Sequence, residues 1–158
     1  ENTMGLDMYL SKRTYIGEAD RKESRELLKI LVKIFCPDNK LNINPERITY
    51  IEEKVGYWRK ANQIHKWFVD NIQAGKDDCG YYPVTSENLE SLLSLIERVL
   101  DDHTLAGNLL PTQRGTFFRY TEYDGWYFDD LKDTKKILTD LLKEPDIEST
   151  ELQYHASW

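Results

Sequence analysis

Short amphipathic segments, separated by stretches rich in Gly, Pro, Asn and Asp, follow one another along the whole chain of 158 residues. Apolar residues recur at helical spacing in four of them, which predicts helices over 21–36, 55–73, 86–101 and about 124–143. Other segments carry alternating, aromatic or β-branched residues, which predicts strands over 6–16, 47–54, 116–121 and 151–158. The turn-rich stretches between them are predicted to be loops over 38–46, 74–85 and 102–115.

These helices and strands do not alternate strictly, so the order favours an α+β fold over a parallel α/β fold. The length suits one globular domain over 4–158, in which three to four helices pack with a small, mainly antiparallel sheet. Met4 resembles a natural start, so residues 1–3 are interpreted as the remnant of a tag.

The charge of the chain limits its partners. The formal net charge is −7 and the isoelectric point is near 5.0, which argues against a general binder of nucleic-acid phosphates. No apolar run approaches the roughly 20 residues of a membrane span. No signal peptide is visible, so we expect a reducing cytosol. Cys36 and Cys79 do not make a disulfide framework, and Cys36 is expected to be a small core residue.

Aromatic residues make up 12% of the chain and are unevenly distributed. The predicted helix over 86–101 has none, and its apolar residues are Leu, Ile and Val. The rings gather instead in 50–68, 81–82, 117–128 and 154–158. We therefore expect aliphatic side chains to form the core and the four aromatic stretches to converge as a recognition zone. The alternative is that the rings simply fill the core.

The predicted helix over 55–73 carries the first candidate site. On a helix, Trp58, Asn62 and His65 would share one face, with Arg59 beside it. A guanidinium, an amide and an imidazole next to a Trp ring suit a phosphate or carboxylate that carries a stacked ring. The alternative is an amphipathic helix whose histidine makes a hydrogen bond in the core.

The start of the last predicted helix carries the second candidate site. Tyr123, Trp126 and Tyr127 surround a helix N-terminus, whose free N–H groups favour an anion. Asp124 or Thr121 could cap this helix instead, and an acidic cap would fill the same role. The two candidate sites could line one cleft.

Chemistry beyond binding has weaker support in the sequence. Cys79 could be a nucleophile with His65 as its base, but no known local signature surrounds it. The adjacent Asp77 and Asp78 are typical of a solvated turn, and His65, His103 and His155 lack zinc-site spacing. We predict no metal, no cofactor and no assigned catalytic residue.

Several motifs carry a family resemblance: MGLDMYL (4–10), YWRKAN (57–62), IHKWF (64–68), DCG (78–80), YDGWY (123–127) and YHASW (154–158). Together with Asp130 and Leu131, they resemble a family of small bacteriophage and prophage proteins over nearly the whole chain. Gly125 and Trp126 stand where that family is expected to have Glu and Tyr. The resemblance implies a phage accessory protein that acts in the bacterial cytoplasm, and it implies no particular activity.

Three functions remain open on the sequence. The first is sequestration, without catalysis, of a small anionic ring-bearing ligand such as a nucleotide immune signal. The second is inhibition of a host protein through an acidic, aromatic surface. The third is a hydrolase that uses His65 with Cys79 or an Asp. The first is preferred over the second by a small margin.

Overall fold

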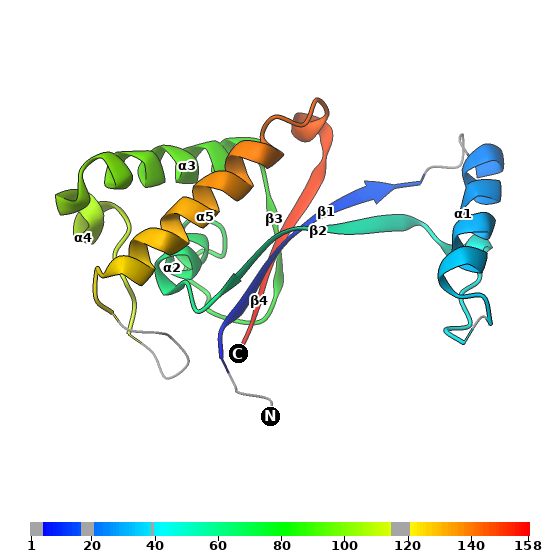
Figure 1. Ribbon diagram of the computed structural model, residues 1–158, viewed down its shortest axis with the longest axis horizontal. Helices are drawn as coiled ribbons and strands as arrows, with labels where there is room; N and C mark the ends of the chain where they lie inside the picture. Colours follow the sequence, from blue (N-terminus) through cyan, green and yellow to red (C-terminus); the bar gives the residue numbers. More distant parts are fainter. Residues whose placement is uncertain (1–4, 17–20, 39, 115–120) are drawn as a thin grey trace. The chain divides into compact units, whose positions relative to one another are not determined.

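Alternating residues form the first strand, β1 (Asp7–Tyr15), in which Met8 and Leu10 are buried. The computed structural model shown in Figure 1 describes residues 5–16, 21–38, 40–114 and 121–158. Within these residues a four-stranded antiparallel sheet has the order β2-β1-β4-β3. Its other strands are β2 (Tyr50–Arg59), β3 (Tyr81–Val84) and β4 (Glu151–Ser157).

Five α-helices accompany the sheet in the described residues: α1 (Arg21–Phe35), α2 (Asn62–Asn71), α3 (Ser86–Asp101), α4 (Ala106–Leu109) and α5 (Gly125–Leu141). Three short 3-10 helices are η1 (Pro45–Arg47), η2 (His103–Leu105) and η3 (Ile147–Ser149). The predicted α+β class with an antiparallel sheet is therefore confirmed. None of the helices described is long and apolar enough to cross a membrane.

The chain divides into two compact units. The large unit comprises the chain up to Lys12 together with Lys54–Trp158, and the small unit is Arg13–Glu53. The large unit holds the main core, in which α5 packs against α3, as Figure 1 shows. The small unit holds α1, which contacts η1. The predicted boundary of one domain over 4–158 stays a prediction.

Most predicted elements have counterparts in the structure. α1, α3 and α5 match the helices predicted over 21–36, 86–101 and 124–143, and β1, β2 and β4 overlap predicted strands. Thr85 caps α3 in a capping box with Asn88, whose side chain bonds the Thr85 N–H at 3.0 Å. The strand predicted over 116–121 and the tag remnant predicted at 1–3 fall almost wholly outside the described residues.

The helix predicted over 55–73 is wrong in its first part. Residues up to Arg59 belong to β2, and α2 begins only at Asn62. Trp58 points into the core and its neighbour Tyr57 is exposed, as strand alternation requires. The aromatic and β-branched residues of this stretch suit a strand, and pairing with β1 outweighs their helical spacing.

Two loop predictions also need correction. β3 lies in the stretch predicted as a loop over 74–85, and it pairs antiparallel with β4, Tyr82 opposite Tyr154. Pro83 suggested a turn, but β3 is an edge strand, where a proline is tolerated because one side of the strand needs no partner. The stretch predicted as a loop over 102–115 contains η2 and α4.

The separation of aliphatic core from aromatic zone is also wrong. The core cluster combines Leu and Ile side chains with five aromatic residues: Trp58, Trp67, Phe68, Tyr127 and Tyr154. Leu27 and Ile34 of α1, by contrast, are exposed, and Cys36 is only partly buried. Those five rings meet inside the core of the large unit, whereas five other rings of the four aromatic stretches are exposed: Tyr50, Tyr57, Tyr81, Tyr123 and Trp126.

Gly56 of β2 lies close to its neighbours. A Cβ atom at this position would lie 2.9 Å from Trp58 Cη2, 3.2 Å from Leu10 Cβ and 3.3 Å from Ile137 Cγ2. Gly56→Ala is therefore expected to lower the free energy of unfolding by about 1–3 kcal/mol through overpacking. Urea denaturation measures this loss, and Gly125→Ala, whose Cβ meets nothing within 4 Å, is the control. Equal effects of the two substitutions would contradict the packing argument.

Candidate functional site

A tight turn joins β2 to α2 and fixes the direction of the predicted site residues. Lys60 has a positive φ of 62°, and its N–H donates to the Leu6 carbonyl at 2.8 Å. The Asn62 N–H then donates back to the Lys60 carbonyl at 2.9 Å. Because the chain turns here, the side chains of Trp58 and Arg59 project from a strand. Those of Asn62 and His65 project from a helix.

Trp58 is part of the core. Its indole Nε1–H donates to Thr134 Oγ1 of α5 at 2.8 Å, and that hydroxyl donates to the Asp130 carbonyl at 2.6 Å. The ring is buried and lies 6.2 Å from the Phe68 ring, centroid to centroid. Arg59 extends to the opposite side of the strand, where its Nε lies 4.0 Å from Asp7 Oδ1. The two residues therefore do not form one binding face.

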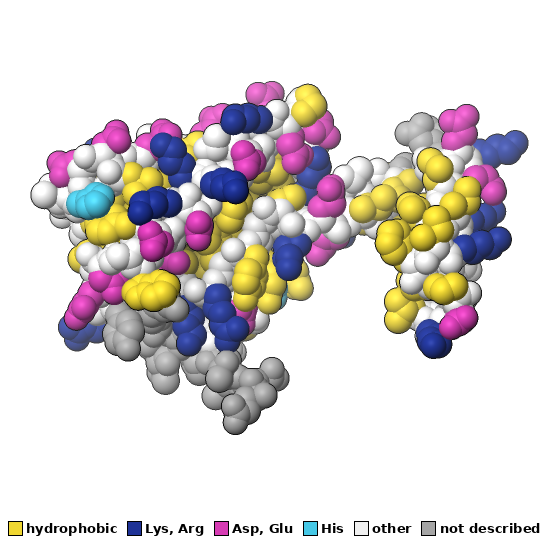
Figure 2. Space-filling view, viewed as in Figure 1, with side chains coloured by type: hydrophobic (Ala, Val, Ile, Leu, Met, Phe, Trp, Pro, Cys, Tyr) yellow, Lys and Arg dark blue, Asp and Glu magenta, His cyan; other side chains and the backbone are white. Residues whose placement is uncertain are grey.

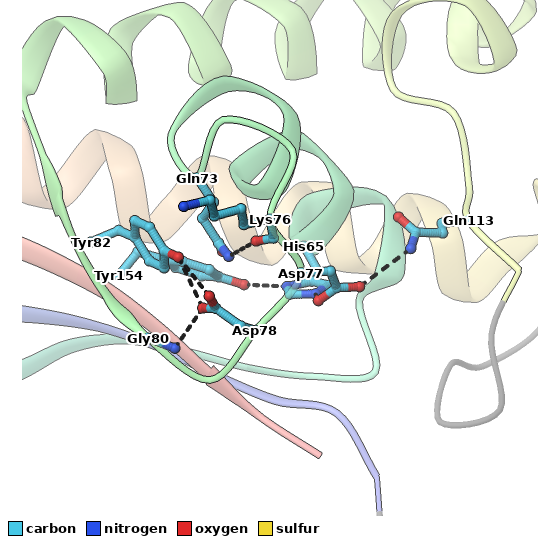
Figure 3. A network of polar contacts seen from close by, with 9 residues as sticks. All are labelled: His65, Gln73, Lys76, Asp77, Asp78, Gly80, Tyr82, Gln113 and Tyr154. Carbon is cyan, nitrogen blue, oxygen red and sulfur yellow. Dashed lines mark hydrogen bonds and ion pairs between the residues drawn. The ribbon is translucent and has the colours of Figure 1, made fainter.

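His65 is a buried member of a polar cluster, shown in Figure 3, that reaches the surface at Asp77. Its Nδ1 is 2.7 Å from the Tyr154 hydroxyl of β4, and its Nε2 is 2.8 Å from Asp77 Oδ1. Gln113 Nε2 donates to the other oxygen of Asp77 at 3.5 Å. A neutral imidazole that donates from Nε2 to the carboxylate and accepts the Tyr154 proton at Nδ1 satisfies every group.

Electrostatics agree with a neutral His65. Burial lowers the pKa of His65, and the hydrogen bond that His65 donates to Asp77 only partly opposes this effect. Burial likewise raises the pKa of Tyr154 well above its ordinary value, so its phenol keeps its proton. Because both ring nitrogens of a fully buried imidazole are engaged, His65 presents no nitrogen to a substrate. The cluster ties α2, β4 and the Asp77 loop together.

The loop after α2 uses its two adjacent carboxylates separately. Asp77 serves His65, whereas Asp78 Oδ1 accepts the Gly80 N–H at 2.8 Å and the Tyr82 hydroxyl at 2.9 Å. The hydrogen bond to Asp78 raises the pKa of Tyr82. Cys79, which lies between Asp78 and Gly80 in the sequence, is exposed. In the part of the chain that the structure describes, no group of three or more His, Cys, Asp or Glu side chains could hold a metal ion.

The start of α5 is capped as one of the sequence alternatives predicted. Asp124 Oδ1 accepts the Tyr127 N–H at 3.1 Å. Tyr127 is buried and donates its hydroxyl to the Leu110 carbonyl at 2.8 Å, and burial raises its pKa. Tyr123 packs edge-on against Tyr127 and is exposed, and Trp126 is 60% exposed.

The two predicted clusters meet at one small crevice. Asn62 of the first candidate site lines it together with Trp126 and Tyr127 of the second, and the other predicted site residues do not line it. Its volume is only about 10 Å³, room for about one water molecule. Glu122, Asp124 and Asp130 line it against the single cation of Lys60. Carboxylates in this excess repel an anion, so the crevice is poorly suited to the predicted ligand.

A much larger groove of about 460 Å³ lies elsewhere in the large unit. Its apolar lining comes from Val55, Ile137 and Leu141, and Tyr57 adds an exposed ring. The charged lining comes from α5 and the residues after it: Asp133, Lys136, Asp140 and Glu144. The groove thus joins an apolar floor to a rim in which acidic residues outnumber the one lysine.

The acidic residues at the rim of this groove differ from one another in how their charges are balanced. Glu144 Oε2 lies 2.5 Å from Lys12 Nζ, so its charge is matched within the fold. Asp133 and Asp140 are exposed and make no ion pair within the described ranges. Tyr57 is held at the groove by its hydroxyl, which donates to Asp7 Oδ1 at 2.6 Å. The exposed carboxylates of Asp133 and Asp140 therefore line the same groove as the anchored ring of Tyr57.

Sequence reasoning missed this groove. Asp133, Ile137 and Asp140 are spaced at i, i+4 and i+7, so the periodicity of α5 alone places them on one helix face. Their partner surface, Val55 and Tyr57, lies far away in sequence and was assigned to a helix. Only the assignment of Val55 and Tyr57 to strand β2 brings their surface opposite this face of α5.

Comparisons with protein-family models, curated proteins and solved structures gave no match to this chain. The resemblance to phage proteins therefore stays a prediction, and the function is argued from the geometry.

Proposed function

We propose that this chain is a non-enzymatic binding protein whose acidic groove engages a basic segment of a partner protein, as an inhibitor of a bacterial host protein would. The observation that carries the proposal is the groove of about 460 Å³, in which Asp133 and Asp140 flank the exposed Tyr57 ring. Lys and Arg side chains of a partner would lay their aliphatic stems on the apolar floor and their charged ends on the carboxylates.

The distribution of charge supports the same partner. Residues 13–53 hold eight basic and eight acidic residues, whereas the rest of the chain holds 13 basic and 20 acidic ones. The whole net charge of −7 therefore belongs to the part of the chain that forms the groove. A field of one sign accelerates the encounter with a basic protein and repels acidic competitors.

The small anionic ligand has less support and remains a hypothesis. Pockets for such ligands usually measure about 300–1,000 Å³. The crevice near Asn62 and Trp126 holds about 10 Å³, and the charged residues that line the larger groove are mainly acidic. Trp58 and His65, which were expected to contact the ligand, are buried.

A peptide-binding measurement tests the proposed function. The probe is a fluorescein-labelled 12-residue peptide of alternating Lys and Leu, with a Glu–Leu peptide as its acidic counterpart. Of the two peptides, we expect only the Lys–Leu peptide to bind. The double substitution Asp133→Asn and Asp140→Asn is expected to weaken its binding about tenfold, since two exposed charge contacts are lost. Fluorescence anisotropy at low and high salt measures the affinity.

The matched control is Glu90→Gln with Asp101→Asn, which removes the same charge from exposed positions of α3 outside the groove. The control is expected to change the affinity less than twofold. Equal weakening by both pairs would show attraction to net charge only, and no binding of the Lys–Leu peptide to the unmodified chain would overturn the proposal.

A further inference from the structure

The groove that carries the proposed function runs along a strand with a free edge. β2 is the outermost strand of the sheet, so it is paired on one side only, with β1. Tyr57 projects from the face of β2 that is turned away from the core, whereas the buried Trp58 projects into the core. On the core side, a Cβ atom at Gly56 would lie 3.3 Å from Ile137 Cγ2 of α5. Because both Tyr57 and Ile137 line the groove, the groove passes the free edge of β2.

The backbone of β2 offers hydrogen-bonding groups at this edge. Just beyond the strand, the Lys60 N–H donates at 2.8 Å to the carbonyl of Leu6, the residue before β1. Successive residues of a strand direct their N–H and C=O groups to opposite sides, so those of Val55 and Tyr57 point to the free edge. Outside the sheet itself, no backbone hydrogen bond among the described residues involves Val55 or Tyr57. An added strand would satisfy these groups.

We infer that the basic segment of the partner binds as an additional strand along β2, an inference that rests on the proposed function. The part of β2 in the large unit, residues 54–59, has room for about six residues of an added strand, which is a typical strand length. When a peptide adds to a sheet edge, main-chain hydrogen bonds give affinity and alternate side chains give specificity. The partner is therefore recognised through an extended segment with a period of two residues.

The two faces of the added strand would meet different surfaces. Every second side chain would lie toward α5, where Asp133 and Asp140 are placed on either side of Ile137 along the helix. A Lys or Arg side chain there would rest its aliphatic stem on Ile137 and its charge beside a carboxylate. Figure 2 shows acidic side chains beside hydrophobic ones over α5.

The intervening side chains of the added strand would lie beside Val55 and Tyr57. The Lys54 ammonium lies 5.4 Å from the centroid of the Tyr57 ring, so this face already holds a cation and favours apolar residues over basic ones. The preferred segment is therefore expected to alternate basic and apolar residues.

Charge favours a basic segment over a second copy of this chain at the same edge. The chain outside residues 13–53, which forms the groove, carries the whole net charge of −7. Two copies joined through β2 would bring two such parts together, and like charges repel. A basic segment is attracted by the same field.

N-methylation of the labelled Lys–Leu peptide tests the inference on the unmodified chain. One version carries N-methyl groups on three central Leu residues, and its matched control carries them on three central Lys residues. In an added strand only one of these sets points its N–H groups at β2, where a methyl group removes the donor and blocks close approach. We expect that set to lose at least tenfold in affinity by fluorescence anisotropy, and the other set to change less than threefold.

The set that loses affinity also gives the direction of the added strand. In an antiparallel pair, the residues that bond Val55 and Tyr57 have their side chains on the same face as these two residues. The Leu set is therefore expected to lose affinity if the segment continues the antiparallel sheet. Loss in the Lys set alone would support a parallel added strand.

The outcomes separate this inference from the proposed function. Equal losses in both sets, or no loss in either, would overturn strand addition and leave the groove as a binding site for basic peptides. No binding of the unmodified Lys–Leu peptide would overturn both proposals. In sedimentation equilibrium, a chain of twice 18.7 kDa that the Lys–Leu peptide dissociates would assign the edge to a second copy and overturn the inference.

Discussion

Replacing Phe68 by Ala is expected to lower the free energy of unfolding by about 3–5 kcal/mol, the usual cost of truncating a buried aromatic ring. Phe68 is fully buried on α2. Its ring stacks on Tyr154 of β4 with centroids 3.9 Å apart and an interplanar angle of 6°. It also meets Trp67 edge-on at 5.2 Å. The substitution would therefore remove the ring that joins the helix to the sheet.

Urea denaturation followed by circular dichroism, at one protein concentration, measures this loss. Trp126→Ala is the control, because it removes a larger ring from a position that is 60% exposed. The control is expected to change the free energy of unfolding by less than about 1 kcal/mol. If both substitutions destabilise the chain equally, the assignment of Phe68 to the core is contradicted.

The stability of the chain is expected to fall as the pH drops below about 6.5, the ordinary pKa of histidine. Burial lowers the pKa of His65 in the folded state, so on acidification the unfolded chain takes up its proton first. The stabilisation is complete above the unfolded pKa and is lost as the pH falls toward the folded pKa. One proton gives a slope of at most about 1.4 kcal/mol per pH unit.

The structural reason is the direction of the hydrogen bond between His65 and Tyr154. Neutral His65 accepts from Tyr154 at Nδ1, and a protonated ring would force that buried hydroxyl to reverse its role. Measurement of the free energy of unfolding between pH 7.5 and 5.5 tests this prediction. His65→Gln should flatten the profile, and His103→Gln, at an exposed histidine, should leave it steep. An unchanged slope in His65→Gln would refute the assignment.

The two predicted ligand clusters show where sequence reasoning succeeded and where it failed. The helix cap at Asp124 was predictable, because it depends on residues three positions apart. The shared face of Trp58, Asn62 and His65 was not, since it assumed one helix through the turn at Lys60. The seven residues predicted to bind a ligand, Trp58, Arg59, Asn62, His65, Tyr123, Trp126 and Tyr127, keep that role only as a prediction. Trp58, Asn62, His65 and Tyr127 are buried.

The sequence by itself determined the α+β class and most of the element order, including α1, α3, α5, β1 and β4. These depend on periodicity and end signals, which are properties of neighbours in the chain. The net charge and its absence from residues 13–53 were likewise present in the sequence.

Only the tertiary structure decided which apolar residues are inside. Phe68 and Tyr154 are buried because two distant segments stack, whereas Leu27 and Ile34, equally apolar and regularly spaced, remain exposed. Burial depends on what the fold brings opposite a side chain, and local spacing does not contain that information. The same holds for the groove, because β2 and α5 meet there from segments that are far apart in the sequence.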